Sequence, residues 1–460
     1  MYHIDFERPC NVHFIGIGGI SMSGLAEILL ERGFTVSGSD ARESELTKKL
    51  EAHGAKLFYG QKAENIMEGT DVVVYTAAVH PDNPEYAAAA GRSIPILTRA
   101  ELLGQIMRNY NQSVAVAGTH GKTTTTSMLT EILMEARKDP TISVGGMLDA
   151  IGGNIRVGGP EMFVTEACEY TNSFLSFFPT MEIILNIEAD HLDFFKDIDD
   201  IRNSFRRFAG LLPEDGILII NSDIREYEEI CKGLPCRVIT VGSDPVRSRY
   251  SAAHVAFDES ACASYELLEN GKKICTVVLG VPGMHNVYNS LAAFAAAREL
   301  GVDDGDICAG LLAYRGTHRR FEKKGVLNGV TIIDDYAHHP QEIAATLSTA
   351  ENYPHRELWC VFQPHTYTRT RALMDDFAEA LSAADHVVLA DIYAARETDT
   401  LGISSSMLAE KIAGLGTDAW YFPSFSEIEE FLLEKCGSGD LLITMGAGDI
   451  VKVGENLLKK

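Results

Sequence analysis

The sequence is poor in the features that mark membrane, nucleic-acid-binding and disulfide-stabilised proteins. It has no apolar run approaching the roughly 18 residues that cross a bilayer, and the opening residues 1–8 lack the basic and apolar regions of a secretory signal. Its 40 basic residues are outnumbered by 65 acidic ones, and a net charge of −25 argues against nucleic-acid partners. The 9 cysteines occur singly, with no Cys-x-x-Cys pair, which excludes a disulfide framework or a zinc knuckle. We therefore expect a cytoplasmic protein without membrane insertion.

The remaining composition predicts a multidomain α/β protein. A length of 460 residues suggests about three domains, and 46% hydrophobic residues suffice for packed cores. Strand patterns alternate with helical patterns along the chain, which is typical of parallel sheets. Polar segments divide the chain into 1–110, 111–317 and 318–460. We expect an N-terminal Rossmann-like domain, a central P-loop-type ATPase sheet and a C-terminal doubly wound Rossmann-like sheet.

The most informative motif lies between a small apolar strand, 113–117, and a helical pattern that begins at Lys122. Such a strand–loop–helix unit directs backbone N–H groups and the positive end of a helix at one point, which suits a triphosphate. Lys122 would contact the β- and γ-phosphates, and Thr123 would reach Mg²⁺. The loop is shorter than the spacing G-x-x-x-x-G-K-[ST] requires, because position 116 is Val; an ordinary glycine-rich turn is the alternative. The predicted ATP-binding residues are Gly118, Thr119, His120, Gly121, Lys122, Thr123 and Thr124.

Two further polar residues follow predicted strands of the central sheet. Glu166 ends the strand 163–166, and His191 closes the segment after the strand 183–186. Because the carboxyl ends of parallel strands face the ligand crevice, Thr123, Glu166 and His191 could share one or two Mg²⁺ ions. The alternative is that Glu166 caps a helix and His191 is a surface histidine.

The other signals are weaker when taken alone. Gly16 and Gly18 follow the first strand, and Asp40 ends the next one, which is nearly the dinucleotide-binding pattern. Three arginines in the segment 314–322 suit a phosphate or carboxylate in so acidic a chain, although a solvated hinge without a ligand is the alternative.

Taken together, these motifs resemble the Mur ligases of bacterial peptidoglycan synthesis along essentially the whole chain. Seven motifs occur in the family's order, which is far more specific than any one of them. They are Gly16–Gly24, Gly118–Thr125, Asn186–His191, Gly283–Asn286 with Asn289, Gly316–Glu322, Asp334–Pro340, and Phe362–His365 with Thr368–Arg371.

The resemblance implies an ATP-dependent amide ligase that acts on small molecules. The muramoyl carboxylate of UDP-N-acetylmuramate would attack the γ-phosphate of ATP, and the amine of L-alanine would then attack the acyl phosphate. A sibling activity, which joins a recycled murein tripeptide to the same UDP substrate, is the nearest alternative. Two other hypotheses explain less of the sequence. A nicotinamide-dependent oxidoreductase would not account for Lys122, and a P-loop switch or scaffold would not account for the first domain. We expect a monomer or a weak homodimer.

The resemblance also implies roles for individual residues. The expected catalytic residues are Lys122, Glu166, His191, Arg320 and His338. The residues expected at the UDP substrate are Gly16, Gly18, Gly19, Ile20, Ser21, Asp40 and His80. Those expected at the nucleotide, beyond the loop, are His285, Asn286, Asn289, Arg319, Arg320, Asp335 and Tyr336. The alanine carboxylate should meet His338, Arg369 and Arg371.

The sequence departs from the family pattern in two places. Several relatives carry a carbamylated lysine downstream of the metal histidine, but 197–212 contains no lysine, so that modification is not expected. Thr366 stands where some members have arginine. Glu169 stays an open candidate for a group behind the metal ligands, without an assigned role.

Overall fold

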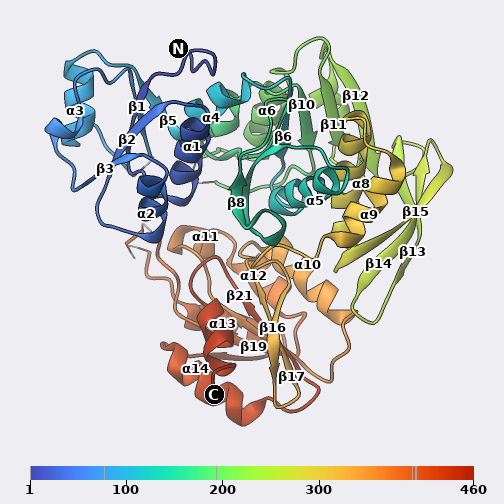
Figure 1. Ribbon diagram of the computed structural model, residues 1–460. Coiled ribbons are helices and arrows are strands. Elements are labelled where there is room, and N and C mark those ends of the chain that lie inside the picture. Colours follow the sequence, from blue (N-terminus) through green and yellow to red (C-terminus); the bar gives the residue numbers. More distant parts are fainter. Residues whose placement is uncertain (1, 77, 193, 396, 399–400) are drawn as a thin grey trace. The chain divides into compact units, whose positions relative to one another are not determined.

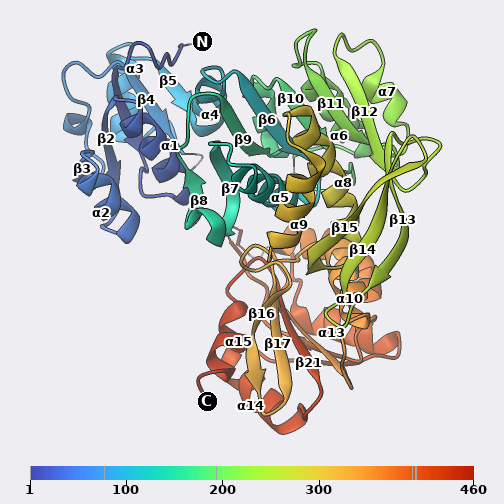
Figure 2. The same ribbon diagram turned by 45° about the vertical axis from the view of Figure 1, so that its right-hand side comes forward.

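The computed structural model describes residues 2–76, 78–192, 194–395, 397–398 and 401–460 (Figures 1 and 2). It contains two compact units. The first comprises Met1–Tyr250 with Ala292–Gly310, and the second comprises Ser251–Leu291 with Leu311–Lys460. The expected alternation of strands and helices is present throughout.

The first sheet, blue in Figure 1, is built around β1 (Asn11–Ile15), whose last four residues are buried. Its strand order is β3-β2-β1-β4-β5 and all of its pairs are parallel. The order reverses between β1 and β4, which is where ligands bind in sheets of this type. The Rossmann-like prediction is confirmed. The other elements are α1 (Ile20–Glu31), β2 (Thr35–Asp40), α2 (Glu45–Ala52), β3 (Lys56–Tyr59), η1 (Ala63–Asn65), β4 (Val72–Tyr75), α3 (Pro84–Gly91), β5 (Ile96–Thr98) and α4 (Arg99–Met107).

The second sheet is built around β6 (Gln112–Ala117), a buried run of small residues. Within the first unit its order is β12-β11-β10-β6-β9-β7-β8. β6 lies between two parallel neighbours, β9 and β10, as its two-sided burial requires. The elements are α5 (Lys122–Glu135), β7 (Thr141–Leu148), η2 (Asp149–Ile151), β8 (Gly153–Arg156), β9 (Met162–Ala167), η3 (Tyr170–Ser176), β10 (Met181–Ile184), α6 (Ile198–Ala209), β11 (Ile217–Asn221), α7 (Tyr227–Cys231) and β12 (Arg237–Gly242).

The second unit begins with β13 (Tyr250–Phe257), β14 (Cys262–Glu269) and β15 (Lys272–Pro282). β14 and β15 form an antiparallel hairpin, and its turn residues Asn270 and Gly271 both have positive φ. The Asn-Gly pair is the sequence signal typical of such a turn. Two helices follow in the chain, α8 (Met284–Glu299) and α9 (Asp304–Ala313), and their residues from Ala292 to Gly310 belong to the first unit.

The third sheet has the order β16-β17-β21-β18-β19-β20. All its pairs are parallel except the first, β16 with β17. The doubly wound prediction is confirmed. The elements are β16 (Glu322–Leu327), β17 (Val330–Asp335), α10 (Pro340–Glu351), β18 (Leu358–Phe362), α11 (Tyr367–Ala372), α12 (Met374–Leu381), β19 (His386–Leu389), α13 (Ser405–Gly414), β20 (Asp418–Tyr421), α14 (Phe425–Lys435), β21 (Leu441–Met445) and α15 (Val451–Leu457).

Helix α4 of the first sheet packs closely against η3 of the second at Gly104. A Cβ atom at Gly104 would lie 1.9 Å from the backbone oxygen of Ser176, a contact that no side-chain rotation can relieve. We expect Gly104→Ala to lower the free energy of unfolding by about 1–3 kcal/mol, because overpacking outweighs a helix-propensity gain of up to about 1 kcal/mol. Gly91→Ala is the matched control, since nothing lies within 4 Å of its added Cβ. Chemical denaturation tests this, and equal stability of the two variants would contradict it.

Candidate active site

The loop between β6 and α5 is held open by the segment that follows β10. The Asn186 side chain accepts a hydrogen bond from the His120 N–H at 2.7 Å and donates one to the His120 carbonyl at 3.0 Å. The Thr119 hydroxyl accepts from the Glu188 N–H at 3.0 Å. Gly118 and Gly121 both have positive φ, the latter just before α5 begins, so the loop needs glycine at these two positions. The helix N-terminus expected for a phosphate site is present.

Lys122, the first residue of α5, is held by a carboxylate to which the sequence assigned no role. Its ammonium group donates to Glu169 at 3.1 Å, to the Thr119 carbonyl at 3.0 Å and to the Gly118 carbonyl. The Glu169 side chain is 3% exposed. Burial alone lowers the pKa of Lys122, but attraction to Glu169 outweighs it, so the pKa lies above its usual value. Lys122 is therefore cationic and paired with Glu169.

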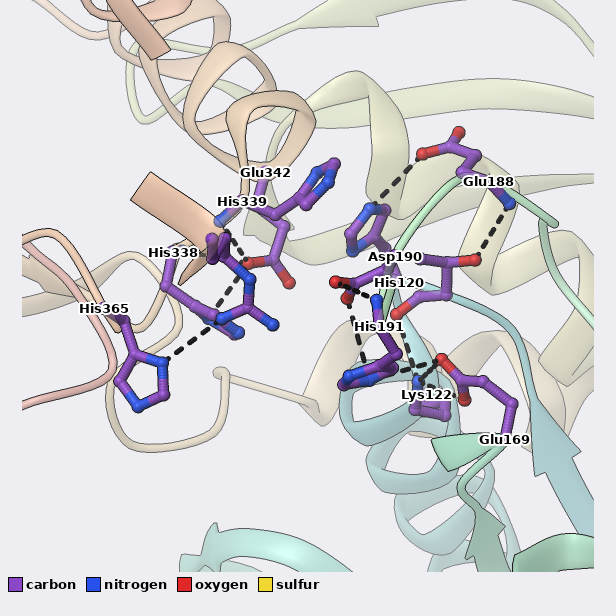
Figure 3. A network of polar contacts seen from close by, with 12 residues as sticks. His120, Lys122, Glu169, Glu188, Asp190, His191, His338, His339, Glu342 and His365 are labelled. Atoms are coloured by element: carbon purple, nitrogen blue, oxygen red, sulfur yellow. Dashed lines mark hydrogen bonds and ion pairs between the residues drawn. The ribbon is translucent and has the colours of Figure 1, made fainter. Parts of the chain in front are cut away.

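His191 lies beside this ion pair (Figure 3). Its Nε2 is 4.0 Å from Glu169 and 3.7 Å from Asp190, and its ring packs on Tyr170 with the ring centres 4.5 Å apart. His191 also has a φ of 53°, a strained conformation for a residue with a side chain. Such strain is often found at functional sites, and here it turns the imidazole toward Glu169 and Lys122.

Glu166 stands near the carboxyl end of β9, in register with Val116 on β6. Its carboxylate accepts a hydrogen bond of 2.5 Å from the Gly145 N–H on β7. Among the described residues, no group of three or more His, Cys, Asp or Glu side chains is placed to hold a metal by itself. Mg²⁺ usually takes only one or two carboxylates and fills its shell with water and phosphate. The oxygen donors Thr123 and Glu166 therefore fit a magnesium ion that binds together with ATP.

The first sheet carries a separate cavity, the N-terminal crevice, with a volume of about 730 Å³. Five predicted residues line it, namely Gly16, Gly18, Gly19, Asp40 and His80. Asp40 accepts hydrogen bonds of 2.8 Å from the N–H groups of Gly18 and Ala41, so it shapes the glycine loop. Ile20 and Ser21 are exposed at the start of α1 and are not among the lining residues.

In the second unit, the residues expected at adenine gather at the start of α8. Asn286 donates to the Pro282 carbonyl at 2.7 Å, and Asn289 donates to the Asn286 side chain at 3.0 Å. Burial and the charge of Arg320 lower the pKa of His285 to about 4, so this imidazole is neutral at pH 7. The structure thus brings His285, Asn286 and Asn289 together with Arg320.

The two hinge arginines differ in their surroundings. Arg319 donates to Asp334 at 3.0 Å and to the carbonyls of Gly446 and Gly448 at 2.7 and 3.0 Å. These bonds tie the hinge to β17 and to the loop after β21, and nucleotide binding by Arg319 stays a prediction. Arg320 lies over the Tyr336 ring at 5.3 Å and 3.8 Å from Glu342.

Asp335, at the end of β17, organises the backbone around Arg320. Its carboxylate accepts from the Phe321 N–H at 2.8 Å and the Ala337 N–H at 2.7 Å. Burial raises the pKa of Asp335 to about 6, although Arg320 and both N–H groups favour ionisation.

This pKa makes the contribution of Asp335 to stability depend on pH. A carboxyl whose pKa is raised on folding stabilises the folded state below its unfolded pKa, near 4, and loses that contribution as the pH rises through about 6. We expect the free energy of unfolding of wild type relative to Asp335→Asn to fall by about 2 kcal/mol between pH 4 and pH 7. Denaturation of the full chain at both pH values measures this, and a difference independent of pH would contradict it.

The residues expected at the amino-acid carboxylate are only partly assembled. His338 Nδ1 lies 3.2 Å from Glu342, and its ring centre is 5.7 Å from that of His365, which in turn meets Arg369 at 3.2 Å. Burial lowers the pKa of His338. Arg371 is exposed on α11. The structure therefore brings His338 and Arg369 close to His365 but does not place Arg371 with them.

Several polar residues of these clusters were not assigned a role from the sequence: Glu169, Glu188, Glu342 and His365. Glu188 forms an ion pair of 3.3 Å with His120 on the ATP loop. In the sequence, the only indication that Glu188 belongs to the site was its position in the Asn186–His191 motif. For His365 it was its position in the motif that begins at Phe362.

Comparison with protein families finds three domain models of Mur ligases that match successive parts of the chain. The Mur ligase catalytic domain matches residues 11–111, the Mur ligase middle domain matches 116–297, and the glutamate ligase domain of Mur ligases matches 319–448. The chain belongs to the Mur ligase family. The resemblance read from the seven motifs is therefore confirmed, and an oxidoreductase or a P-loop switch is no longer needed to explain them.

Individual Mur ligases are similar over their full length. The chain is 64% identical to a UDP-N-acetylmuramate–L-alanine ligase of Lachnospira eligens and 61% identical to one of Agathobacter rectalis, with complete coverage of all chains. Among solved structures, a UDP-N-acetylmuramate–alanine ligase of Thermotoga maritima matches with a TM-score of 0.80 at 30% identity and 98% coverage of both chains. A murein peptide ligase of Psychrobacter arcticus matches with a TM-score of 0.68 at 26% identity and the same coverage. None of the described helices of this Mur ligase combines the length and apolar character needed to cross a membrane.

Proposed function

We propose that this Mur ligase joins UDP-N-acetylmuramate to L-alanine with conversion of ATP to ADP and phosphate, in peptidoglycan precursor synthesis. The observation that carries the proposal is the arrangement at β6 and α5, where Lys122 begins a helix beside the carboxyl ends of two parallel strands. The two relatives that are more than 60% identical bear the name of this activity. The alignments cover 100% of this chain and of both relatives, so the predicted substrate-binding segments are included.

In the proposed reaction, the lactyl carboxylate of the UDP substrate attacks the γ-phosphate and forms an acyl phosphate. Lys122 and Arg320 stabilise the charge on the transferred phosphoryl group. Thr123, Glu166 and His191 would hold one or two Mg²⁺ ions, which would supply further charge neutralisation. The amine of L-alanine then attacks the acyl carbon, and phosphate leaves. His338 and Arg369 hold the alanine carboxylate, and the neutral His338 can accept a proton.

The N-terminal crevice takes the UDP part of the substrate in this proposal. Its glycine loop, with Gly16, Gly18 and Gly19, leaves room for a pyrophosphate close to the backbone. Ile20 and Ser21 begin α1, whose N-terminus favours negative charge. We also propose that the three parts of the chain act as domains 1–110, 111–317 and 318–460, in the cytoplasm, as a monomer or weak homodimer.

Phosphate release tests the proposal and separates it from tripeptide ligation. With ATP and Mg²⁺ present, we expect rapid release only when both UDP-N-acetylmuramate and L-alanine are added. Replacing L-alanine with the tripeptide L-alanyl-γ-D-glutamyl-meso-diaminopimelate should abolish it. Turnover with the tripeptide and not with L-alanine would assign the sibling activity, which the fold of the murein peptide ligase also accommodates.

A further inference from the structure

A buried carboxylate lies directly behind the N-terminal crevice. Glu85, near the start of α3, is 0% exposed, and its two oxygens receive four hydrogen-bond donors. The Ser39 hydroxyl and the Asn65 amide donate at 2.6 and 2.5 Å. His13 Nε2 lies at 3.4 Å, and the Lys62 N–H at 3.3 Å. A carboxylate has about four acceptor positions, so this one is fully used.

Three of the four donors, Ser39, Asn65 and the Lys62 N–H, lie next to or near residues that line the crevice. Ser39 precedes Asp40, which lines the crevice and holds the glycine loop. Lys62 follows Gln61, another lining residue, and Asn65 also donates to the Gly60 carbonyl at 3.0 Å. Glu85 itself follows the lining residues at the start of α3. One side chain therefore joins the end of β2, the 60–65 turn and the start of α3 from behind.

Two more contacts extend the network on either side of Glu85. Asn83, which lines the crevice, donates to the Gln61 side chain at 2.5 Å and caps α3 by accepting from the Glu85 N–H at 2.9 Å. His13 on β1 contacts the Ser37 hydroxyl on β2 at 2.9 Å. His13 is also 0% exposed, so its partners can only be these buried groups.

The chemistry of the network indicates a purpose beyond packing. Taking a carboxylate out of water is costly unless it is fully hydrogen-bonded, and apolar residues of similar size often fill a core equally well. Burial raises the pKa of Glu85, but the hydrogen bonds from His13, Ser39 and Asn65 outweigh it, so the pKa is lowered overall. The carboxylate is thus ionised at neutral pH, and its charge-assisted bonds are stronger than neutral ones.

We propose that Glu85 is a positioning residue that fixes the walls of the N-terminal crevice for the UDP substrate. The inference rests on the proposed function, because it assumes that this crevice is where UDP-N-acetylmuramate binds. Glu85 does not touch the substrate in this account. It holds Asp40, Gln61 and Asn83 in the arrangement that binds it, and a binding wall displaced by about 1 Å loses much of its effect.

The test compares three variants of the full-length protein by calorimetry with UDP-N-acetylmuramate and by steady-state kinetics. Glu85→Ala removes all four acceptor positions, and we expect binding of the UDP substrate to weaken at least tenfold. The kcat at saturating substrate and the KM values for ATP and L-alanine should stay within about twofold, since the chemistry lies elsewhere. Glu85→Gln should restore most of the binding, because its amide can face Ser39 and His13, which can both act as acceptors.

Glu101→Ala is the matched control. Glu101 lies in the same part of the chain near the start of α4, where it accepts from Thr98 in a capping box and touches no wall of the crevice. It should lose stability but bind the UDP substrate like wild type. If Glu85→Ala does not fold, Ser39→Ala, which removes one hydrogen bond, should weaken binding several-fold.

The outcomes separate this inference from the proposed function. Normal binding by Glu85→Ala, or by Ser39→Ala in its place, would overturn the positioning role while leaving the ligase proposal intact. Equal weakening by Glu101→Ala would also overturn it, because the effect would then be general destabilisation. If wild type itself does not bind UDP-N-acetylmuramate, the proposed function fails and the inference fails with it.

Discussion

Replacing Lys122 with alanine is expected to reduce ligation about 10³-fold or more while the protein stays folded. Lys122 is the first residue of α5, and among the described residues its ammonium group donates hydrogen bonds to Glu169 and to two loop carbonyls. Its charge acts on the transferred phosphoryl group, so the loss should fall on kcat and not only on the KM for ATP. Initial rates at saturating substrates measure the effect.

A second variant separates this loss from instability. Lys122→Ala leaves the Glu169 carboxylate, 3% exposed, without its cationic partner, and unpaired buried charge destabilises a protein. The double variant Lys122→Ala/Glu169→Gln removes that charge, so it should recover thermal stability without recovering activity. Near-normal turnover by either variant would mean that the loop is only structural.

We also expect a large loss of activity when Glu166 or His191 is replaced. Replacing either with alanine should lower activity at least tenfold and shift half-maximal activity to higher Mg²⁺ concentration, because each is proposed to hold the ion together with the phosphates. Glu161→Ala is a suitable control, since Glu161 lies just before β9 and its carboxylate accepts a hydrogen bond from the Asn111 side chain at 2.7 Å. A Mg²⁺ titration gives the shift directly.

The same titration can refute the metal assignment. If both variants lose activity but keep the Mg²⁺ dependence of wild type, Glu166 and His191 do not hold the ion. Glu166 would then serve to fix the β7 strand through its bond to the Gly145 N–H.

The parts of the fold that depend on local pattern were predictable from the sequence. The apolar run 113–117 followed by Gly-Lys-Thr predicted the strand, loop and helix around Lys122. The Asn270-Gly271 pair is likewise a typical signal for the turn between β14 and β15. Strand β7 and its partner β8 were not predicted. Their sequence is glycine-rich and short, so it carries neither a clear alternation nor a clear apolar run.

The parts of the site that depend on distant contacts were not predictable. Glu169 is 47 residues from Lys122 in sequence, and no spacing rule links the two. Arg319 and Arg320 are neighbours of the same type, and only the folded positions of Asp334, Gly446 and Gly448 show that Arg319 bonds to β17 and to the loop after β21. Membership in a motif identifies candidate residues. The folded structure is needed to show which contacts each of them makes.

The central claim, that an amide forms through an acyl phosphate at Lys122, is tested most directly by isotope transfer. UDP-N-acetylmuramate labelled with ¹⁸O in its lactyl carboxylate would be incubated with ATP, Mg²⁺ and L-alanine, and the released phosphate analysed by mass spectrometry. The account predicts one ¹⁸O atom in each phosphate, because a carboxylate oxygen attacks phosphorus and leaves with it when the amine attacks carbon. Unlabelled phosphate would show that water or another group had taken the phosphoryl group, and would contradict the account.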